Sequence, residues 1–182
     1  GVVSGVVKRG ICSVILPENT KRVEDSAFYM QDIPSNPDSR DNPVIVLNEG
    51  LETIGIYAFC GYVDDADDFA GGAIIIPNTV TSIGYAAFNL DNASFQSFTT
   101  YGSKFRVYFK SQTPPTMFKI FGEAQSQMNG VIQIYVPTGT TSAYREALGS
   151  QYDTIPIEEY DGNITYMSDL WTYQRLSTQG LI

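Results

Sequence analysis

The chain has 182 residues, of which 43 % are hydrophobic and 17 % charged, a composition that can bury a core and is not typical of disorder. Eleven basic and twenty acidic residues give a formal net charge of −9, which disfavours binding to nucleic acid or anionic lipid. Histidine is absent, which excludes His-dependent acid–base and nucleophile chemistry, and no apolar run approaches the ~18 residues of a membrane span.

The first residues carry neither an initiator Met nor a signal-peptide pattern, so we expect a mature or trimmed chain. The only cysteines, Cys12 and Cys60, are too few for a disulfide framework. We expect two buried thiols, and a single bridge is the alternative.

An internal repeat dominates the first half of the chain. Residues 15–28, 46–59 and 75–88 align without gaps. Each copy begins with a short β-branched run, continues through Pro or Asn and a few polar residues, and ends on an Ala-Phe pair. The pairs end at Phe28, Phe59 and Phe88, and this nearly constant spacing predicts an array of stacked units.

Each position of the repeat has a physical interpretation. The β-branched run predicts a strand, which Pro ends because it has no N–H for the ladder. Val23, Ile54 and Ile83 are expected to point into the core, and Gly55 and Gly84 to allow a bend that a Cβ would resist. The Phe fills the space between units, and its full burial is worth about 1.5–3 kcal/mol.

The array continues in less regular form. Residues 106–109 predict another strand, and Phe118, which follows Phe88 at the spacing of the repeat, is expected to be the aromatic of the fourth unit. Residues 131–137 alternate apolar and polar positions and predict a strand that ends at a Pro. Residues 142–148 predict a short helix with Ser or Thr at its cap and Gly149 after it. The count is about five units.

These residues resemble the BspA-like leucine-rich-repeat family, whose typical unit is a strand followed by I-P-x-x-V-x-x-I-G-x-x-A-F. The match is close over residues 51–60 and 76–88, and the resemblance covers roughly residues 12–160. Two departures are Val23-Glu24 in place of the Ile-Gly pair and Asn48 in place of Pro.

The resemblance implies a β-rich, right-handed leucine-rich-repeat solenoid of about five rungs, with short strands and short helical or 3₁₀ segments, over residues 1–160. Residues 161–182 match no known motif, and we expect them to cap the last rung. The resemblance also implies a secreted or cell-surface protein, and several members of the family bind other proteins or act as adhesins. It implies no cofactor.

The densest acidic cluster is the run Asp64, Asp65, Asp67 and Asp68. Clustered carboxylates are ligands for Ca²⁺, which makes these residues candidates for a calcium site. The run lacks the spacing of an EF-hand loop and its closing Glu. A solvated, self-repelling loop is the favoured alternative.

Aromatic side chains are the candidates for a binding surface. Rings can stack on glycans or on protein partners, although the alternative is that they belong to the core or its edge. Tyr108, in a strand where it alternates with core positions, is the candidate that we expect to be exposed. The other candidates are Tyr57, Tyr62, Tyr85, Phe95, Phe98, Tyr101, Phe105 and Phe109.

Three functions remain open from the sequence. The leading hypothesis is a non-catalytic domain that binds an extracellular protein or glycan. The second is a structural spacer or terminal module of a larger surface protein. The third is a carbohydrate-active enzyme, which would need two carboxyl groups about 5–9.5 Å apart in a cleft.

Overall fold

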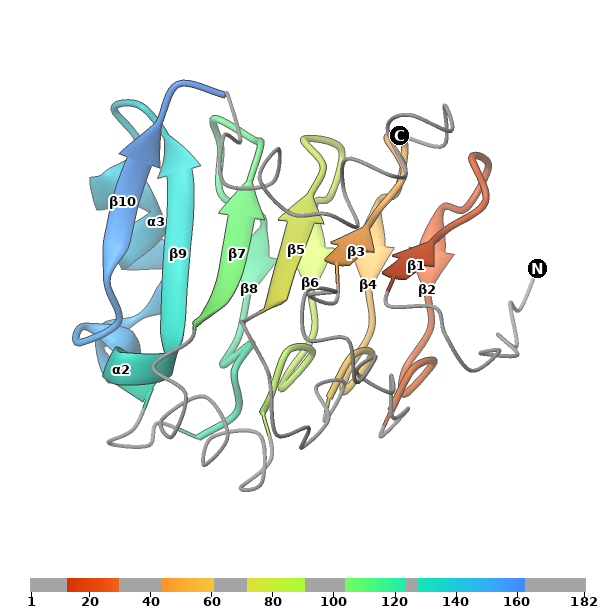
Figure 1. Cartoon of the computed structure of the whole chain (residues 1–182), viewed down its shortest axis with the longest axis horizontal. Coiled ribbons are helices and arrows are strands. Elements are labelled where there is room, and N and C mark those ends of the chain that lie inside the picture. Colours follow the sequence, from red (N-terminus) through yellow and green to blue (C-terminus); the bar gives the residue numbers. More distant parts are fainter. Residues whose placement is uncertain (1–12, 30–43, 61–71, 91–103, 124–127, 163–182) are drawn as a thin grey trace, which may run out of the picture.

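A computed structural model of the chain describes residues 13–29, 44–60, 72–90, 104–123 and 128–162. These residues form two parallel β-sheets with short helices near one end (Figure 1). From β1 to β8 the chain alternates between the sheets, and each strand pairs with the strand of the neighbouring repeat.

The larger sheet has the order β1-β3-β5-β7-β9-β10 and is parallel throughout. One row of Cα partners across it is Val14, Ile45, Ile74, Val107 and Ile134. All five are β-branched, which favours an extended strand. The strands predicted before residues 17, 48 and 77 and over residues 106–109 and 131–137 are therefore confirmed, whereas the sequence pattern does not predict β10. The bounds are β1 (Ser13–Ile15), β3 (Val44–Val46), β5 (Gly72–Ile76), β7 (Phe105–Phe109), β9 (Ile132–Pro137) and β10 (Ile157–Tyr160).

The smaller sheet has the order β2-β4-β6-β8. Val23, Ile54, Ile83 and Met117 are partners in its register. The first three are buried, as the repeat predicts, and Met117 packs against the same core. The strands are β2 (Arg22–Val23), β4 (Thr53–Ile54), β6 (Ser82–Ile83) and β8 (Thr116–Met117).

A tight turn follows the larger-sheet strand in four repeats. The N–H three positions after Pro17, Asn48, Pro77 and Pro137 donates back to the carbonyl of that residue. Where Asn48 departs from the Pro pattern, its side-chain amide also donates to the carbonyl of Glu18 at 2.9 Å. The Asn therefore links two successive turns, which a Pro could not do.

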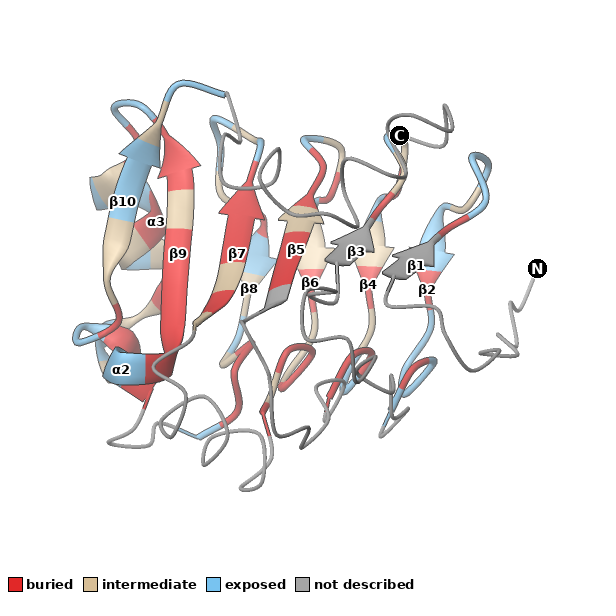
Figure 2. Ribbon diagram, viewed as in Figure 1, coloured by how far each residue is buried: buried red, intermediate tan, exposed pale blue. Residues whose placement is uncertain are grey.

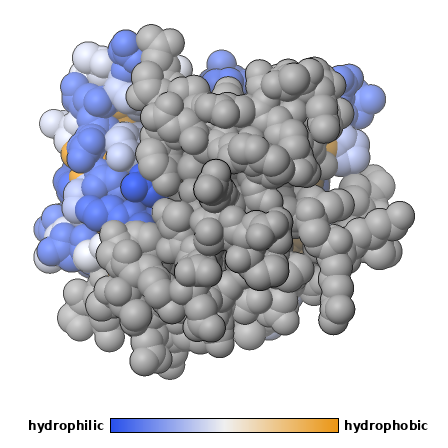
Figure 3. All heavy atoms as spheres, viewed as in Figure 1, coloured by the Kyte–Doolittle hydropathy of each residue, from blue (hydrophilic) through white to orange (hydrophobic). Residues whose placement is uncertain are grey.

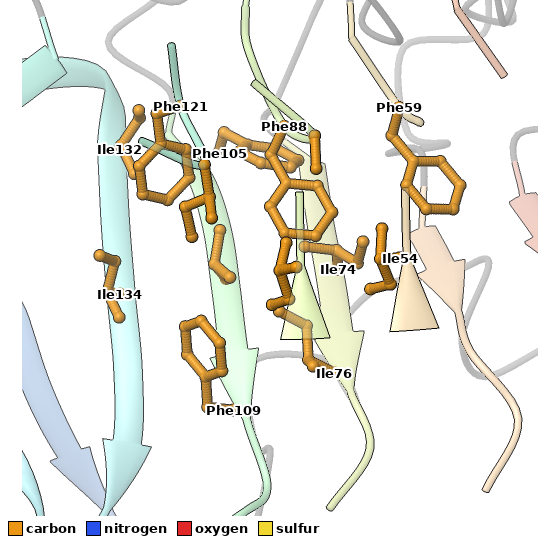
Figure 4. Close-up of a cluster of buried hydrophobic side chains, with 14 of the residues drawn as sticks. Ile54, Phe59, Ile74, Ile76, Phe88, Phe105, Phe109, Phe121, Ile132 and Ile134 are labelled. Carbon is orange, nitrogen blue, oxygen red and sulfur yellow. The ribbon is translucent and has the colours of Figure 1, made fainter. Parts of the chain in front are cut away.

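Buried residues from both sheets form one hydrophobic core. Figure 2 colours these buried positions red along the strands. Its spine is a column of Phe rings, in which Phe28 and Phe59 have centroids 5.0 Å apart, and Phe59 and Phe88 have centroids 6.1 Å apart. The column continues to Phe121, 6.4 Å from Phe88 (Figure 4). Such contacts between units bury rings that a single unit would leave exposed.

The expectation that Phe118 is the core aromatic of the fourth repeat is wrong, because its side chain is 64 % exposed. The register explains the error. Ile83 pairs with Ile54 of the preceding repeat and with Met117 of the following one. The chain from Ile83 to Met117 is longer than the chain from Ile54 to Ile83. A constant spacing from Phe88 therefore selects a residue that precedes the true core position.

The bend expected at Gly55 and Gly84 is not the reason for glycine at these positions. Neither residue has a positive φ, so the backbone conformation does not itself require glycine. A Cβ on Gly55 would lie 2.6 Å from the amide nitrogen of Asp25, and one on Gly84 would lie 2.6 Å from that of Ile56. These glycines are needed because adjacent repeats approach so closely.

Helices α2 (Met128–Val131) and α3 (Thr141–Leu148) and the 3₁₀ helix η1 (Ser150–Tyr152) lie at the β9–β10 end. The predicted helix over residues 142–148 is confirmed, and Gly149 follows it with φ of 84°. The cap differs from the expectation, because the hydroxyl of Thr140 donates to the carbonyl of Pro137 at 2.6 Å and not to the helix.

Two buried tyrosines close this end of the core. The Tyr144 hydroxyl donates to the carbonyl of Ser111 at 2.8 Å. The Tyr152 hydroxyl donates to the carbonyl of Gly122, and its ring lies 5.5 Å from Phe121, next to the Phe column. Burial of the hydroxyls is tolerated because both have partners.

Within the described ranges, no helix is long and apolar enough to cross a membrane. Cys60 is a buried thiol that forms no disulfide with another described residue, whereas Cys12 lies outside the described residues. The boundary at residue 160 and the capping tail stay predictions, since residues 163–182 also lie outside the described part of the chain.

Candidate functional site

Four aromatic side chains, Tyr29, Tyr57, Tyr85 and Phe118, form a row that we call the aromatic strip. Tyr29, Tyr57 and Phe118 are 47 %, 36 % and 64 % exposed, and Tyr85 lies half-buried among them. Each follows a strand of the smaller sheet, and the turns after β2, β4 and β6 lie side by side at one end of the sheets (Figure 1).

A repeated backbone turn holds these rings in place. Ser26, Tyr57, Ala86 and Lys119 occupy the same position in successive turns, and all have φ between 45° and 57°. Amide groups link the turns, because Ser26 donates to the carbonyl of Ile56, and Tyr57 donates to that of Tyr85. The strip is therefore fixed on a hydrogen-bonded backbone and not on an isolated loop.

The rings contact one another along the strip. Tyr29 and Tyr57 have centroids 6.1 Å apart at an interplanar angle of 83°, and Tyr57 and Tyr85 have centroids 5.5 Å apart at 88°. Phe118 lies 6.2 Å from Tyr85 at 35°. The two nearly perpendicular pairs are favourable because the positive edge of one ring meets the negative face of the other.

Charged groups adjoin the Phe118 end of the strip. Lys119 Nζ lies 2.8 Å from both carboxylate oxygens of Glu123 and 5.8 Å from the centroid of Phe118. The Tyr85 hydroxyl is 3.5 Å from Glu123 Oε1. Loss of solvent and then the nearby Tyr57 and Glu123 raise the pKa of Tyr85 above its ordinary value.

The strip agrees only in part with the predicted aromatic candidates. Tyr57 and Tyr85 are predicted candidates and lie on the surface turns. Tyr29 is not a predicted candidate, and the repeat spacing wrongly places Phe118 in the core. Position within the repeat does not identify the strip, because Tyr29 directly follows Phe28, whereas Tyr85 precedes Phe88 by three residues. The strip is apparent only from the way successive turns pack across the smaller sheet.

The expectation that Tyr108 is exposed is wrong, because its side chain retains 3 % exposure. Its ring stacks on its register partner Tyr135 at 4.4 Å and meets the edge of Tyr160 at 5.7 Å. Neighbouring strands thus cover the outward face of β7 at this position. Phe105 and Phe109, on the same strand, are buried as well.

The remaining candidates are not tested. Tyr62, Phe95, Phe98 and Tyr101 lie outside the described residues, as does the proposed calcium cluster of Asp64, Asp65, Asp67 and Asp68. Among the residues that the structure describes, no three His, Cys, Asp or Glu side chains are grouped so that they could hold a metal ion.

A second surface feature is a hollow of about 210 Å³ at the carboxyl ends of β7, β9 and β10. Its lining includes Lys110, Gln112, Thr138 and Tyr160. Lys110 pairs with Glu49, and the Tyr160 hydroxyl donates to the carbonyl of Phe109 at 2.8 Å. The hollow is smaller than the ~300 Å³ at which typical ligand pockets begin.

The described surface near β9 and β10 is mainly hydrophilic on the face that Figure 3 presents. The aromatic strip is the principal group of exposed large apolar side chains in the described part of the chain.

Comparison of the chain with protein-family models, with curated proteins and with solved structures found no match.

Proposed function

We propose that this chain is a non-catalytic, secreted or cell-surface domain that binds an extracellular protein or glycan through the aromatic strip. In this proposal the two parallel sheets are the faces of a right-handed leucine-rich-repeat solenoid of about five rungs. The resemblance to BspA-like repeats supports the solenoid and the extracellular location. The repeated register of both sheets is consistent with it.

The observation that carries the proposal is the exposure of the strip. The rings of the Phe column are at most 6 % exposed, so each repeat has a position that can bury an aromatic ring. Tyr29, Tyr57 and Phe118 instead stay exposed, and the half-buried Tyr85 connects Tyr57 to Phe118. Contiguous exposed aromatic groups typically mark interaction surfaces, where Tyr and Phe are enriched.

A binding screen with two variants tests the proposal. The purified domain is screened against immobilised matrix proteins and a glycan array. The strip variant carries Tyr57→Ser, Tyr85→Ser and Phe118→Ser. The control variant carries Asn129→Ser, Thr138→Ser and Ala143→Ser, which change exposed positions at the β9–β10 end. Neither set changes the net charge.

We expect the wild-type domain and the control variant to bind the same partner, and the strip variant to lose at least tenfold in affinity, about 1.4 kcal/mol. Urea unfolding of all three proteins checks that the variants remain folded. Equal binding by the strip variant contradicts the proposal. Absence of any wild-type binding favours the structural-spacer hypothesis instead.

A further inference from the structure

The aromatic strip already holds a cation that belongs to the chain itself. Lys119 Nζ lies 5.8 Å from the centroid of Phe118, within the ~6 Å at which a cation is attracted by a ring face. The same ammonium group is 2.8 Å from both oxygens of Glu123. A ring and a carboxylate together thus form one cation site on the strip.

Carboxylates lie at both ends of this surface. Asp25, Ile56, Tyr85 and Phe118 occupy the same turn position in four successive repeats, each directly before the residue with positive φ. Asp25 is exposed at the β2 end, and Glu123 is exposed at the β8 end. Ile56, 42 % exposed, and the rings lie between them. The surface is apolar in the middle and has a carboxylate at each end. Glu123 is paired with Lys119, and Asp25 accepts a hydrogen bond from the Ile56 N–H at 2.7 Å.

The electrostatic field of the whole chain is negative, like the charge of these carboxylates. The chain carries a formal net charge of −9, which attracts cationic partners and repels anionic ones. Close to Tyr85, Glu123 is one of the causes that raise the pKa of the phenol, whereas Lys119 lowers it. A cation on Tyr85 would meet a ring face and the Glu123 carboxylate in the field of a negatively charged chain.

The ring geometry argues against a flat platform for sugars. Tyr57 is nearly perpendicular to both Tyr29 and Tyr85, with interplanar angles of 83° and 88°. Successive sugar rings would therefore not find successive coplanar faces. A guanidinium or ammonium group needs only one face at each position.

We infer that the partner is a protein segment that bears Arg or Lys side chains, whose cations lie on the faces of Tyr57 and Tyr85, pair with Asp25, and pair with Glu123 in place of Lys119. This inference rests on the proposed function, because it uses the same strip. It narrows the partner to a cationic peptide.

The test uses a fluorescently labelled octa-arginine peptide, its octa-citrulline isostere and the neutral oligosaccharide cellohexaose. Citrulline keeps the planar shape of Arg and removes its charge. Binding to the whole chain is measured at low and at physiological ionic strength, since surface charge attraction is screened by salt. We expect octa-arginine to bind and octa-citrulline to bind at least tenfold more weakly.

Two pairs of variants separate the strip from the net charge. Replacement of Tyr57, Tyr85 and Phe118 by Ser leaves the charge unchanged and should weaken octa-arginine binding about tenfold. Asp25→Asn with Glu123→Gln should weaken it several-fold. Its charge-matched control, Glu146→Gln with Glu158→Gln at exposed positions of the β9–β10 end, should weaken it by less than twofold.

Equal losses in the two charge-matched pairs, or full binding by the serine variant, would overturn the inference and indicate attraction to the net charge only. Strip-dependent binding of cellohexaose without binding of octa-arginine would overturn the inference but leave the proposed function standing. If neither probe binds and the screen of matrix proteins and glycans also finds no partner, both fail.

Discussion

The backbone at Gly84 passes so close to Ile56 that a Cβ on Gly84 would lie 2.6 Å from the Ile56 amide nitrogen. The N–H of Gly84 donates to the carbonyl of Ile54 at 2.9 Å, which fixes this approach. Gly84→Ala must therefore push two repeats apart. We expect it to lower the free energy of unfolding by about 1–3 kcal/mol in urea denaturation.

Gly130→Ala is the matched control. Gly130 lies in α2, and a Cβ there would meet nothing within 4 Å. Because alanine loses less conformational freedom in a helix than glycine, this change should raise the free energy of unfolding by about 0.5–1 kcal/mol. Equal effects of the two substitutions would show that close approach at Gly84 is not the reason for glycine.

The turn of the first repeat provides a second prediction. Ser26 has φ of 57°, a left-handed conformation that costs a non-glycine residue about 1–2 kcal/mol. Ser26→Gly removes this cost but adds about 0.4–1 kcal/mol of chain entropy to the unfolded state. We expect a net gain of about 0.5–1 kcal/mol in thermal or urea unfolding.

Ser26→Val tests the same turn in the opposite direction. A β-branched side chain is a poorer fit to positive φ than Ser, so the protein should lose at least about 1 kcal/mol. A stability gain with Val, or a loss with Gly, would contradict the strained conformation of this turn.

The exchange of roles between Phe118 and Phe121 gives a third prediction. Phe121→Ala removes a fully buried ring that contacts Phe88 and Tyr152, and it should cost about 3–5 kcal/mol of stability. Phe118→Ala removes a ring that is 64 % exposed and should cost about 0.5 kcal/mol or less. Urea unfolding that ranks the two substitutions in the reverse order would contradict the observed register.

The sequence alone predicts the regular part of this fold well. In the segments that contain Phe28, Phe59 and Phe88, strand, turn and core positions recur at nearly constant spacing, so each position can be assigned locally. The helix over residues 142–148 is also predictable, because it carries its own boundary signals. The coarse β-rich, parallel arrangement follows from these local patterns.

Prediction fails where the outcome depends on neighbouring repeats. Phe118 and Phe121 can be told apart only once Met117 is known to pair with Ile83, and the intervening chain length hides that register. Tyr108 alternates correctly with the core, but Tyr135 and Tyr160 cover it. The exposed strip cannot be predicted from one repeat either, because it forms from contacts between the turns of successive repeats.

Three tyrosines, of which Tyr144 and Tyr152 are buried and Tyr160 is half-buried, predict a loss of stability at alkaline pH. Burial raises the pKa of Tyr160 to about 12 and also raises the pKa values of Tyr144 and Tyr152 from their ordinary value of 10.0. Above about pH 10 the unfolded chain therefore loses phenolic protons that the folded chain retains. Stability is unaffected by these groups below that pH and falls as the pH rises.

Each tyrosine of this set should contribute at most about 1.4 kcal/mol of lost stability per pH unit between about pH 10 and about pH 12. Tyr160→Phe removes one ionising group together with its hydrogen bond to the Phe109 carbonyl. The variant should start about 1 kcal/mol less stable at neutral pH, and its stability should then decline less steeply with pH. Urea unfolding from about pH 9 to about pH 11.5 measures both quantities. A decline as steep as that of the wild-type protein would mean that Tyr160 ionises equally easily in the folded and unfolded chains.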